Sequence, residues 1–286
     1  VNLPDLQTSR LEIFEKIGSN NSSTYRCILG PLSCAVKIYP KTNDESEFTL
    51  VRTVSFLSSI NHPNIIGCIG FETTPKEFRI FFEYCAMGTL SNVIAQRKQK
   101  NTSFSHTELF HYAFEISKGL AHLHSRNTPY RDLKSDHIVL DGNRRQKSPS
   151  NQNPLPHPIV KLWDFTKEST KASIAAFTEC GALEFQPPES PRINAVSTES
   201  FDPFKADIWS FGMLLVELLT LGPPYQAFSR QETIAMIQKG CLPPNIDQTS
   251  VLFPLIKKCT TFKPSERLSA DSIVDYLYNK NKQLNK

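Results

Sequence analysis

The sequence lacks a long apolar run and a close pair of cysteines, and each absence excludes a class of protein. No stretch approaches the roughly 20 apolar residues of a membrane-spanning helix, and no signal-peptide pattern opens the chain. We therefore expect no membrane association. The seven cysteines are an odd number without a C-x-x-C pair. This usage favours a reduced, cytoplasmic compartment over a disulfide framework.

The sequence also lacks a strong charge of one sign. It has 32 basic and 28 acidic residues, which leave a dispersed net charge of +4 at pH 7, too small to predict nucleic acid as a partner. The 286 residues, 39% of them hydrophobic, can bury the large core of one or two domains. No internal repeat is present, and nothing in the pattern indicates the oligomeric state. The first residue is Val rather than Met, as expected of a piece of a longer protein.

Hydrophobic periodicity predicts a strand-rich first part and a helical second part. Alternation over residues 11–39 predicts three short antiparallel strands, and residues 65–71 and 78–84 predict two more. Capping patterns predict helices from Asp44 to about Ser59 and from Ser105 to about His124. Residues 206–219 are apolar all round, which predicts a buried helix. Residues 142–158 are polar and proline-rich, which predicts a mobile insertion.

Two segments have the residue types that phosphoryl transfer requires. Residues 130–139 read Tyr-Arg-Asp-Leu-Lys-Ser-Asp-His-Ile-Val, and residues 164–166 read Asp-Phe-Thr. Asp132 stands two residues from Lys134, on a turn between a helical pattern and a short apolar strand. Phosphoryl transfer uses a carboxylate that orients the substrate hydroxyl, a cation near the migrating group and a second carboxylate for Mg²⁺. Asp132, Lys134 and Asp164 are the candidates for these three roles.

In order along the chain, these segments resemble the H-R-D-L-K-x-x-N and D-F-G signatures of protein kinases. The resemblance implies one α+β, bilobal kinase-like domain over residues 1–286. A small β-rich lobe is expected at about 11–83, a hinge at about 83–88 and a mainly helical lobe at about 89–280. The sequence segment Tyr-Arg-Asp-Leu-Lys-Ser-Asp that begins at Tyr130, called the Tyr130 phrase below, is most similar to the leucine-rich-repeat (Roco) kinases of the tyrosine-kinase-like group.

The same resemblance implies ATP and Mg²⁺ as cofactors and assigns residues to them. Asp132, Lys134 and Lys37 would be catalytic, Asp164 would bind Mg²⁺, and His137 stands at the position of a further magnesium ligand. It also implies that Asp207 braces the catalytic loop and that Glu189 pairs with Arg267. The positions expected to contact the nucleotide are Gly18, Ala35, Lys37, Glu83, Cys85 and Val139.

Several positions depart from the family pattern. Thr53 stands where a helix glutamate would pair with Lys37, so Lys37 is expected to lack that partner. His137 replaces an asparagine, and an imidazole is a poor ligand for Mg²⁺. The other departures are Asn20, Ser23, Thr166 and Ala182.

Two functions therefore stay open at the level of the sequence. One is an ATP-dependent serine/threonine kinase that acts, with weakened activity, on a protein substrate. The other is a pseudokinase that serves as a nucleotide-binding or scaffolding domain for a protein partner. His122 and His124 have no further metal ligands at suitable spacing, so we interpret both as packing or helix-end residues. Residues 164–189 correspond to the activation segment of kinases. Four hydroxyl residues in this segment are candidate phosphorylation sites: Ser169, Thr170, Ser173 and Thr178.

Overall fold

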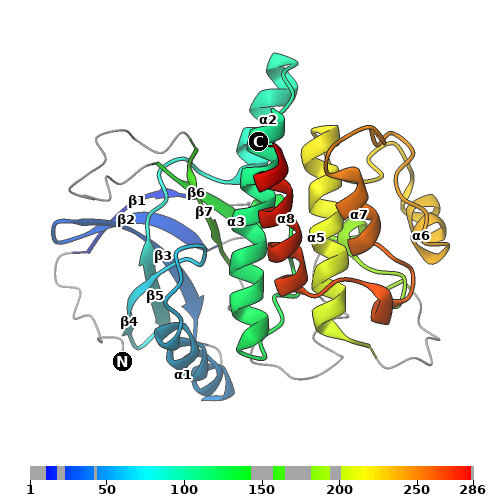
Figure 1. The fold of residues 1–286 in the computed structure, drawn as a ribbon. Helices are drawn as coiled ribbons and strands as arrows, with labels where there is room; N and C mark the ends of the chain where they lie inside the picture. Colours follow the sequence, from blue (N-terminus) through cyan, green and yellow to red (C-terminus); the bar gives the residue numbers. More distant parts are fainter. Residues whose placement is uncertain are drawn as a thin grey trace. The chain divides into compact units, whose positions relative to one another are not determined.

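The computed structural model describes residues 11–17, 23–41, 44–142, 157–164, 182–193 and 201–284. The chain divides into two compact units, Val1–Ala86 and Met87–Lys286, and Figure 1 shows the elements of each. Several predictions lie outside the described residues: Gly18 and Asn20, Thr166, the four candidate phosphorylation sites and nearly all of the insertion. The expected Asp44–Glu47 capping box also concerns side chains outside the described part.

The first unit is an antiparallel sheet with one helix. Its five strands follow the order β1-β2-β3-β5-β4. The elements are β1 (Leu11–Lys16), β2 (Thr24–Leu29), β3 (Leu32–Pro40), α1 (Asp44–Ser59), β4 (Cys68–Thr73) and β5 (Glu77–Glu83), and α1 packs against β4 and β5. The five predicted strands are all present. The fourth begins later than expected, because Ile65 donates its N–H to the His62 carbonyl in a turn instead.

Strand β3 presents different side chains to the two faces of the sheet. Cys34 and Val36 point to the core, and Ala35 and Lys37 point to the opposite face, as the two-residue repeat of a strand requires. The ladder fixes the backbone of Lys37 between Thr24 of β2 and Ile80 of β5. Four buried residues form a core cluster on one face: Cys27, Cys34, Val36 and Phe81. No disulfide joins the cysteines that the structure describes.

The second unit is mainly helical, with one short hairpin. Helix α3 packs against α8, and α5 packs against α7. The described helices are α2 (Leu90–Lys100), α3 (His106–Ser125), α5 (Pro203–Thr220), α6 (Arg230–Gln238), α7 (Phe253–Cys259) and α8 (Ala270–Leu284). The described residues of this unit also form three 3₁₀ turns, η1 (Ser135–His137), η2 (Leu183–Phe185) and η3 (Pro264–Glu266), and the hairpin of β6 (Ile138–Asp141) and β7 (Ile159–Leu162). A β-sheet part followed by a helical part confirms the predicted α+β class.

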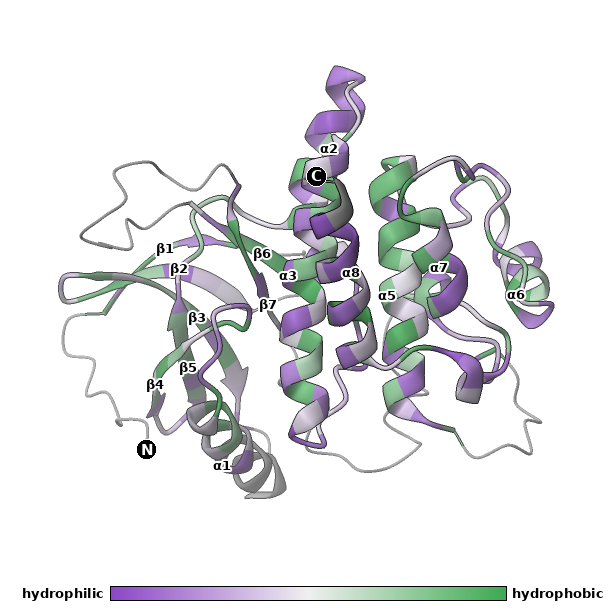
Figure 2. Ribbon diagram, viewed as in Figure 1, coloured by the Kyte–Doolittle hydropathy of each residue, from purple (hydrophilic) through white to green (hydrophobic). Residues whose placement is uncertain are grey.

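Helix α5 is the buried centre of the second unit. Every residue from Ala206 to Leu218 is buried, and Figure 2 shows the helix as largely hydrophobic. The Asp202 carboxylate caps its start by accepting the N–H groups of Phe204 at 2.9 Å and Lys205 at 3.2 Å. The helix therefore begins three residues before the predicted segment. No described helix is both long and apolar enough to cross a membrane.

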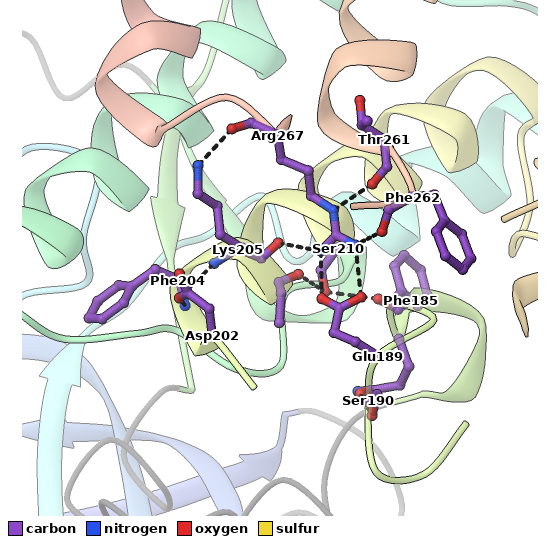
Figure 3. A network of polar contacts seen from close by, with 12 residues as sticks. Phe185, Glu189, Ser190, Asp202, Phe204, Lys205, Ser210, Thr261, Phe262 and Arg267 are labelled. Atoms are coloured by element: carbon purple, nitrogen blue, oxygen red, sulfur yellow. Dashed lines mark hydrogen bonds and ion pairs between the residues drawn. The ribbon is translucent and has the colours of Figure 1, made fainter. Parts of the chain in front are cut away.

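A buried ion pair joins the segment before α5 to the segment before α8. Arg267 donates from its two terminal nitrogens to the two oxygens of Glu189, at 2.7 and 2.8 Å. Figure 3 shows this two-bond contact within a wider network of polar contacts. The two side chains are 0% and 7% exposed, and Arg267 also donates to the Thr261 carbonyl at 2.8 Å. The pair implied by the kinase resemblance is therefore present.

We expect Arg267→Ala to destabilise the second unit by roughly 3–5 kcal/mol, because it leaves the Glu189 carboxylate buried without its counter-ion. The matched control is Lys263→Ala, which removes a Lys263–Glu266 contact of 3.7 Å between side chains that are 71% and 57% exposed. Its effect should stay below about 1 kcal/mol. Urea unfolding measures both values. Equal losses in the two variants would contradict the importance of the buried pair.

Candidate active site

The loop that connects α3 to β6 is held by one buried carboxylate, Asp207 of α5. Its two oxygens accept the backbone N–H groups of Tyr130 and Arg131, each at 2.6 Å. Arg131 has a φ of +77°, and this left-handed conformation costs an L-residue about 1–2 kcal/mol. A hydrogen bond to a charged group contributes about 1.5–3 kcal/mol, so Asp207 can offset the strain. The brace predicted for Asp207 is confirmed.

His124, at the end of α3, also contacts this carboxylate. Its Nε2 lies 2.9 Å from Oδ2 of Asp207. Asp207 is 1% exposed, and a buried carboxylate requires such partners around it. The interpretation of His124 as a packing or helix-end residue is confirmed, because it lies in the last turn of α3 and its ring packs edge-on against Phe204. The ring also contributes a polar contact to the brace of the loop.

Tyr130 connects the start of the loop to the segment that follows β7. Its buried hydroxyl donates to the carbonyl of His137 at 3.1 Å and to the carbonyl of Trp163. Burial raises the pKa of Tyr130 well above its usual value, and the charges of Asp164 and Asp132 raise it further. The hydroxyl therefore keeps its proton and stays a donor.

The β6–β7 hairpin brings the second carboxylate next to the loop. Its register pairs Ile138 with Leu162, and the Trp163 N–H continues the ladder to the His137 carbonyl at 2.9 Å. Asp164 follows directly, with a φ of +64°. Its Oδ2 lies 3.8 Å from Nε2 of His137. The hairpin thus sets the distance between the two predicted motifs.

Four predicted site residues come together here in the second unit. Lys134 Nζ lies 3.1 Å from Oδ2 of Asp132. His137 Nδ1 lies 2.8 Å from the Asp132 carbonyl oxygen and 3.4 Å from its Oδ2. The side chains of Asp132, Lys134, His137 and Asp164 are 14–23% exposed. Solvent and a substrate can therefore reach this group of charges.

Glu217 of α5 is a contributor that sequence reasoning missed. Its Oε1 accepts the Ser135 hydroxyl at 2.7 Å, and its buried Oε2 has no hydrogen-bond partner in the structure. Burial raises the pKa of Glu217 to about 7, and the negative charge of Asp136 adds to this shift. A glutamate inside an apolar helix was the available signal. Glu217 thus holds the loop at Ser135, beyond the contacts of Asp207 with Tyr130 and Arg131.

Lys37 and Ala35, two of the predicted nucleotide contacts, are buried on β3 in the first unit. Lys37 Nζ lies 5.7 Å from the centre of the Tyr39 ring. Thr53 is buried on α1. That Thr53 leaves Lys37 without a helix partner stays a prediction.

The predicted hinge contacts, Glu83 and Cys85, also belong to the first unit. The Glu83 N–H donates to the Gly67 carbonyl at 3.0 Å, and its carboxylate accepts the Gly67 N–H at 2.8 Å. Cys85 is buried. Val139 lies on β6 of the second unit, where it forms a bridge with Thr89. The joint role of these residues toward one nucleotide stays a prediction.

The residues present fit one magnesium ion better than two. Asp164 offers partly exposed carboxylate oxygens, which are the ligands that Mg²⁺ prefers. His137 offers an imidazole nitrogen where the kinase pattern has an amide oxygen, and magnesium binds nitrogen poorly. The donor set therefore supports a magnesium role for Asp164 and not for His137.

The chain belongs to the protein kinase family, because the Protein kinase domain matches residues 11–279. It is 29% identical to Kinase and exchange factor for Rac B of Dictyostelium discoideum, over 96% of this chain and 24% of that protein. It is 28% identical to Serine/threonine-protein kinase CTR1 of Arabidopsis thaliana, over 96% of this chain and 32% of that protein. It is also 28% identical to Leucine-rich repeat serine/threonine-protein kinase 1 of Caenorhabditis elegans, over 78% of this chain and 9% of that protein.

The chain thus spans a third or less of the length of these three relatives. The similarity concerns a kinase domain and not the remainder of each relative. The relatives include kinases of the tyrosine-kinase-like type, in agreement with the group that the Tyr130 phrase predicted.

The raised pKa of Glu217 predicts a pH-dependent stability. The carboxyl group ionises at about 7 in the folded state and at about 4.5 in the unfolded state. The contribution of Glu217 to the free energy of unfolding should therefore be greatest below pH 4.5 and fall as the pH rises through 7, by at most about 3 kcal/mol. Glu217→Gln should remove this fall.

Urea unfolding of wild type and variant at pH 5 and pH 8 measures the difference, and Glu266→Gln, on the exposed turn η3, is the control. Identical pH profiles for wild type and Glu217→Gln would contradict the raised pKa.

Proposed function

We propose that this domain transfers the γ-phosphoryl group of ATP to serine or threonine hydroxyls of a protein substrate, at a rate below that of an unimpaired kinase. The observation that carries the proposal is the contact between Asp132 and Lys134, 3.1 Å apart on a loop braced by Asp207. A carboxylate and an ammonium in fixed, partly exposed positions match the needs of phosphoryl transfer, which depends mainly on positioning and charge.

Within this proposal each predicted site residue has a distinct role. Asp132 orients the substrate hydroxyl and accepts its proton, and Lys134 stabilises the charge on the transferred group. Asp164 holds Mg²⁺, and Lys37 contacts the phosphates. ATP supplies the phosphoryl group, and the bound magnesium neutralises its charge. The backbone strain at Arg131 is compatible with a preorganised loop, since strained conformations concentrate at functional sites.

A specific pair of observations supports the second function, a nucleotide-binding pseudokinase with a scaffolding role. His137 fills the space between Asp132 and Asp164 with an imidazole. Ala182 has no hydroxyl where the family has a threonine, so it offers no side-chain hydrogen bond at the start of η2. Both departures reduce the groups that position phosphate and substrate. They favour weak phosphoryl transfer. A complete loss of transfer activity would make the domain a pseudokinase.

Preference for serine and threonine rests on Lys134 and on the names of the relatives, which include several serine/threonine kinases. A particular closeness to leucine-rich-repeat kinases rests on the Tyr130 phrase, since relatives of other architecture have similar identity. A cytoplasmic location is proposed from cysteine usage alone.

The catalytic role of Asp132 predicts that Asp132→Asn lowers phosphate transfer by roughly 10²–10⁴-fold, the usual contribution of a positioned base. ATP affinity should change little, because Asp132 is assigned to the substrate hydroxyl. Radiolabel transfer and calorimetry measure the two quantities, with exposed Asp271→Asn on α8 as the control. An unchanged transfer rate in Asp132→Asn would overturn this assignment, and no transfer by the wild type would favour the pseudokinase.

The role of Lys37 predicts that Lys37→Met weakens ATP binding, because the change removes a cation and keeps most of the bulk of the side chain. The matched control is Lys76→Met, at an exposed turn of the same unit. Calorimetric titration with ATP and Mg²⁺ compares the affinities. If wild type and Lys37→Met bind ATP equally well, Lys37 does not contact the phosphates.

A further inference from the structure

His137 has the hydrogen bond at one ring nitrogen that a metal-binding histidine usually has. Its Nδ1 lies 2.8 Å from the backbone carbonyl oxygen of Asp132. Its Nε2 faces the carboxylate of Asp164, with 3.8 Å between Nε2 and Oδ2. In metal sites the ligating histidine almost always donates its other ring N–H to a carbonyl or a carboxylate. The surroundings of His137 follow this pattern.

The contact at Nδ1 determines which nitrogen can bind a metal. A backbone carbonyl oxygen only accepts hydrogen bonds, so Nδ1 must carry the hydrogen. In the neutral ring the lone pair then lies on Nε2, the nitrogen that faces Asp164. In this tautomer the lone pair of His137 lies on the nitrogen that is 3.8 Å from Oδ2 of Asp164, the residue proposed to hold a metal.

The distance between the two ligand atoms suits a shared cation after a small movement. Two atoms that each lie about 2.1 Å from a metal are about 3.0–3.4 Å apart at bond angles of 90–110°. Nε2 and Oδ2 are 3.8 Å apart, so an approach of roughly half an ångström is enough. Both side chains are partly exposed, at 14% and 23%.

The pair needs further ligands. Among the described residues, no group of three or more His, Cys, Asp or Glu side chains could hold a metal ion. Two protein ligands therefore form half of a site, and phosphate oxygens of the nucleotide must complete it. Metal binding here should depend on the nucleotide.

We propose that His137 Nε2 and Asp164 Oδ2 form a nucleotide-dependent half-site for a first-row transition cation, with Mn²⁺ favoured over the Mg²⁺ that Asp164 would hold without His137. Mixed nitrogen and oxygen ligands disfavour magnesium, which requires oxygen and near-ideal octahedral geometry. Transition cations accept imidazole. The replacement of asparagine by histidine then changes the cation rather than removing the site. This inference rests on the proposed nucleotide binding.

The test uses the whole domain with Mn²⁺ and a non-hydrolysable ATP analogue. Pulsed electron paramagnetic resonance detects a nitrogen nucleus bound to Mn²⁺. The wild type should show an imidazole nitrogen coupling, and His137→Asn should lose it. His106→Asn, at the exposed start of α3, should retain it. Because all variants bind the same analogue, a signal from the base of the nucleotide is common to all of them.

Calorimetry supplies a second measurement. We compare the affinity for the ATP analogue in Mn²⁺ with its affinity in Mg²⁺. The ratio of the Mn²⁺ value to the Mg²⁺ value should be at least about tenfold lower in His137→Asn than in the wild type, because tenfold is the lower end of the losses seen when a metal site is disturbed. Thermal melts show whether each variant is folded.

Three outcomes would overturn the half-site. If the wild type binds the analogue with Mn²⁺ but shows no imidazole coupling, the half-site is wrong and nucleotide binding stands. If the analogue binds equally well without any divalent cation, no metal is held between His137 and Asp164 and the half-site is wrong. If the folded wild type binds no nucleotide with either cation, both the half-site and the proposed function are wrong.

Discussion

The candidate site depends on the contact between one buried carboxylate and two consecutive backbone N–H groups. Asp207 accepts from Tyr130 and Arg131 at 2.6 Å each, and it belongs to the most buried helix of its unit. The positive φ of Arg131 is unfavourable, and the contacts with Asp207 stabilise it. This conformation orients the backbone of the residues that follow Arg131. Asp132 and Lys134 have their positions as a consequence.

Much of the fold could be predicted from the sequence, because its signals are local. Ser105 and Glu108 form the capping box that starts α3, and Asp202 with Pro203 explains why α5 begins before its apolar pattern does. The start of β4 differed from its prediction, and the helices α2, α6, α7 and α8 were not predicted. Ile65 is apolar and resembles a strand residue, but a backbone turn closed by the His62 carbonyl takes it out of the ladder.

The site was predictable where a motif names the residue, even for contacts that span the chain such as those of Asp207 with the loop. Asp132, Lys134, His137 and Asp164 stand at motif positions, and the hairpin register brings them together. Glu217 was missed because no predicted motif includes it, although its contact with Ser135 joins residues 82 positions apart in the same way. Composition and periodicity cannot identify such a pair. A polar residue in a buried helix indicates only that some partner must exist.

The departures from the kinase pattern differ in their consequences because they affect different kinds of atom. The brace of Asp207 uses backbone N–H groups, which every residue except proline has. Tyr130 can therefore replace histidine without loss of the brace, and its hydroxyl adds contacts to two carbonyl groups. A metal ligand is a side-chain atom, so His137 in place of the expected asparagine would change the chemistry of the proposed metal site. In our proposal the loop keeps its shape while the preferred cation changes.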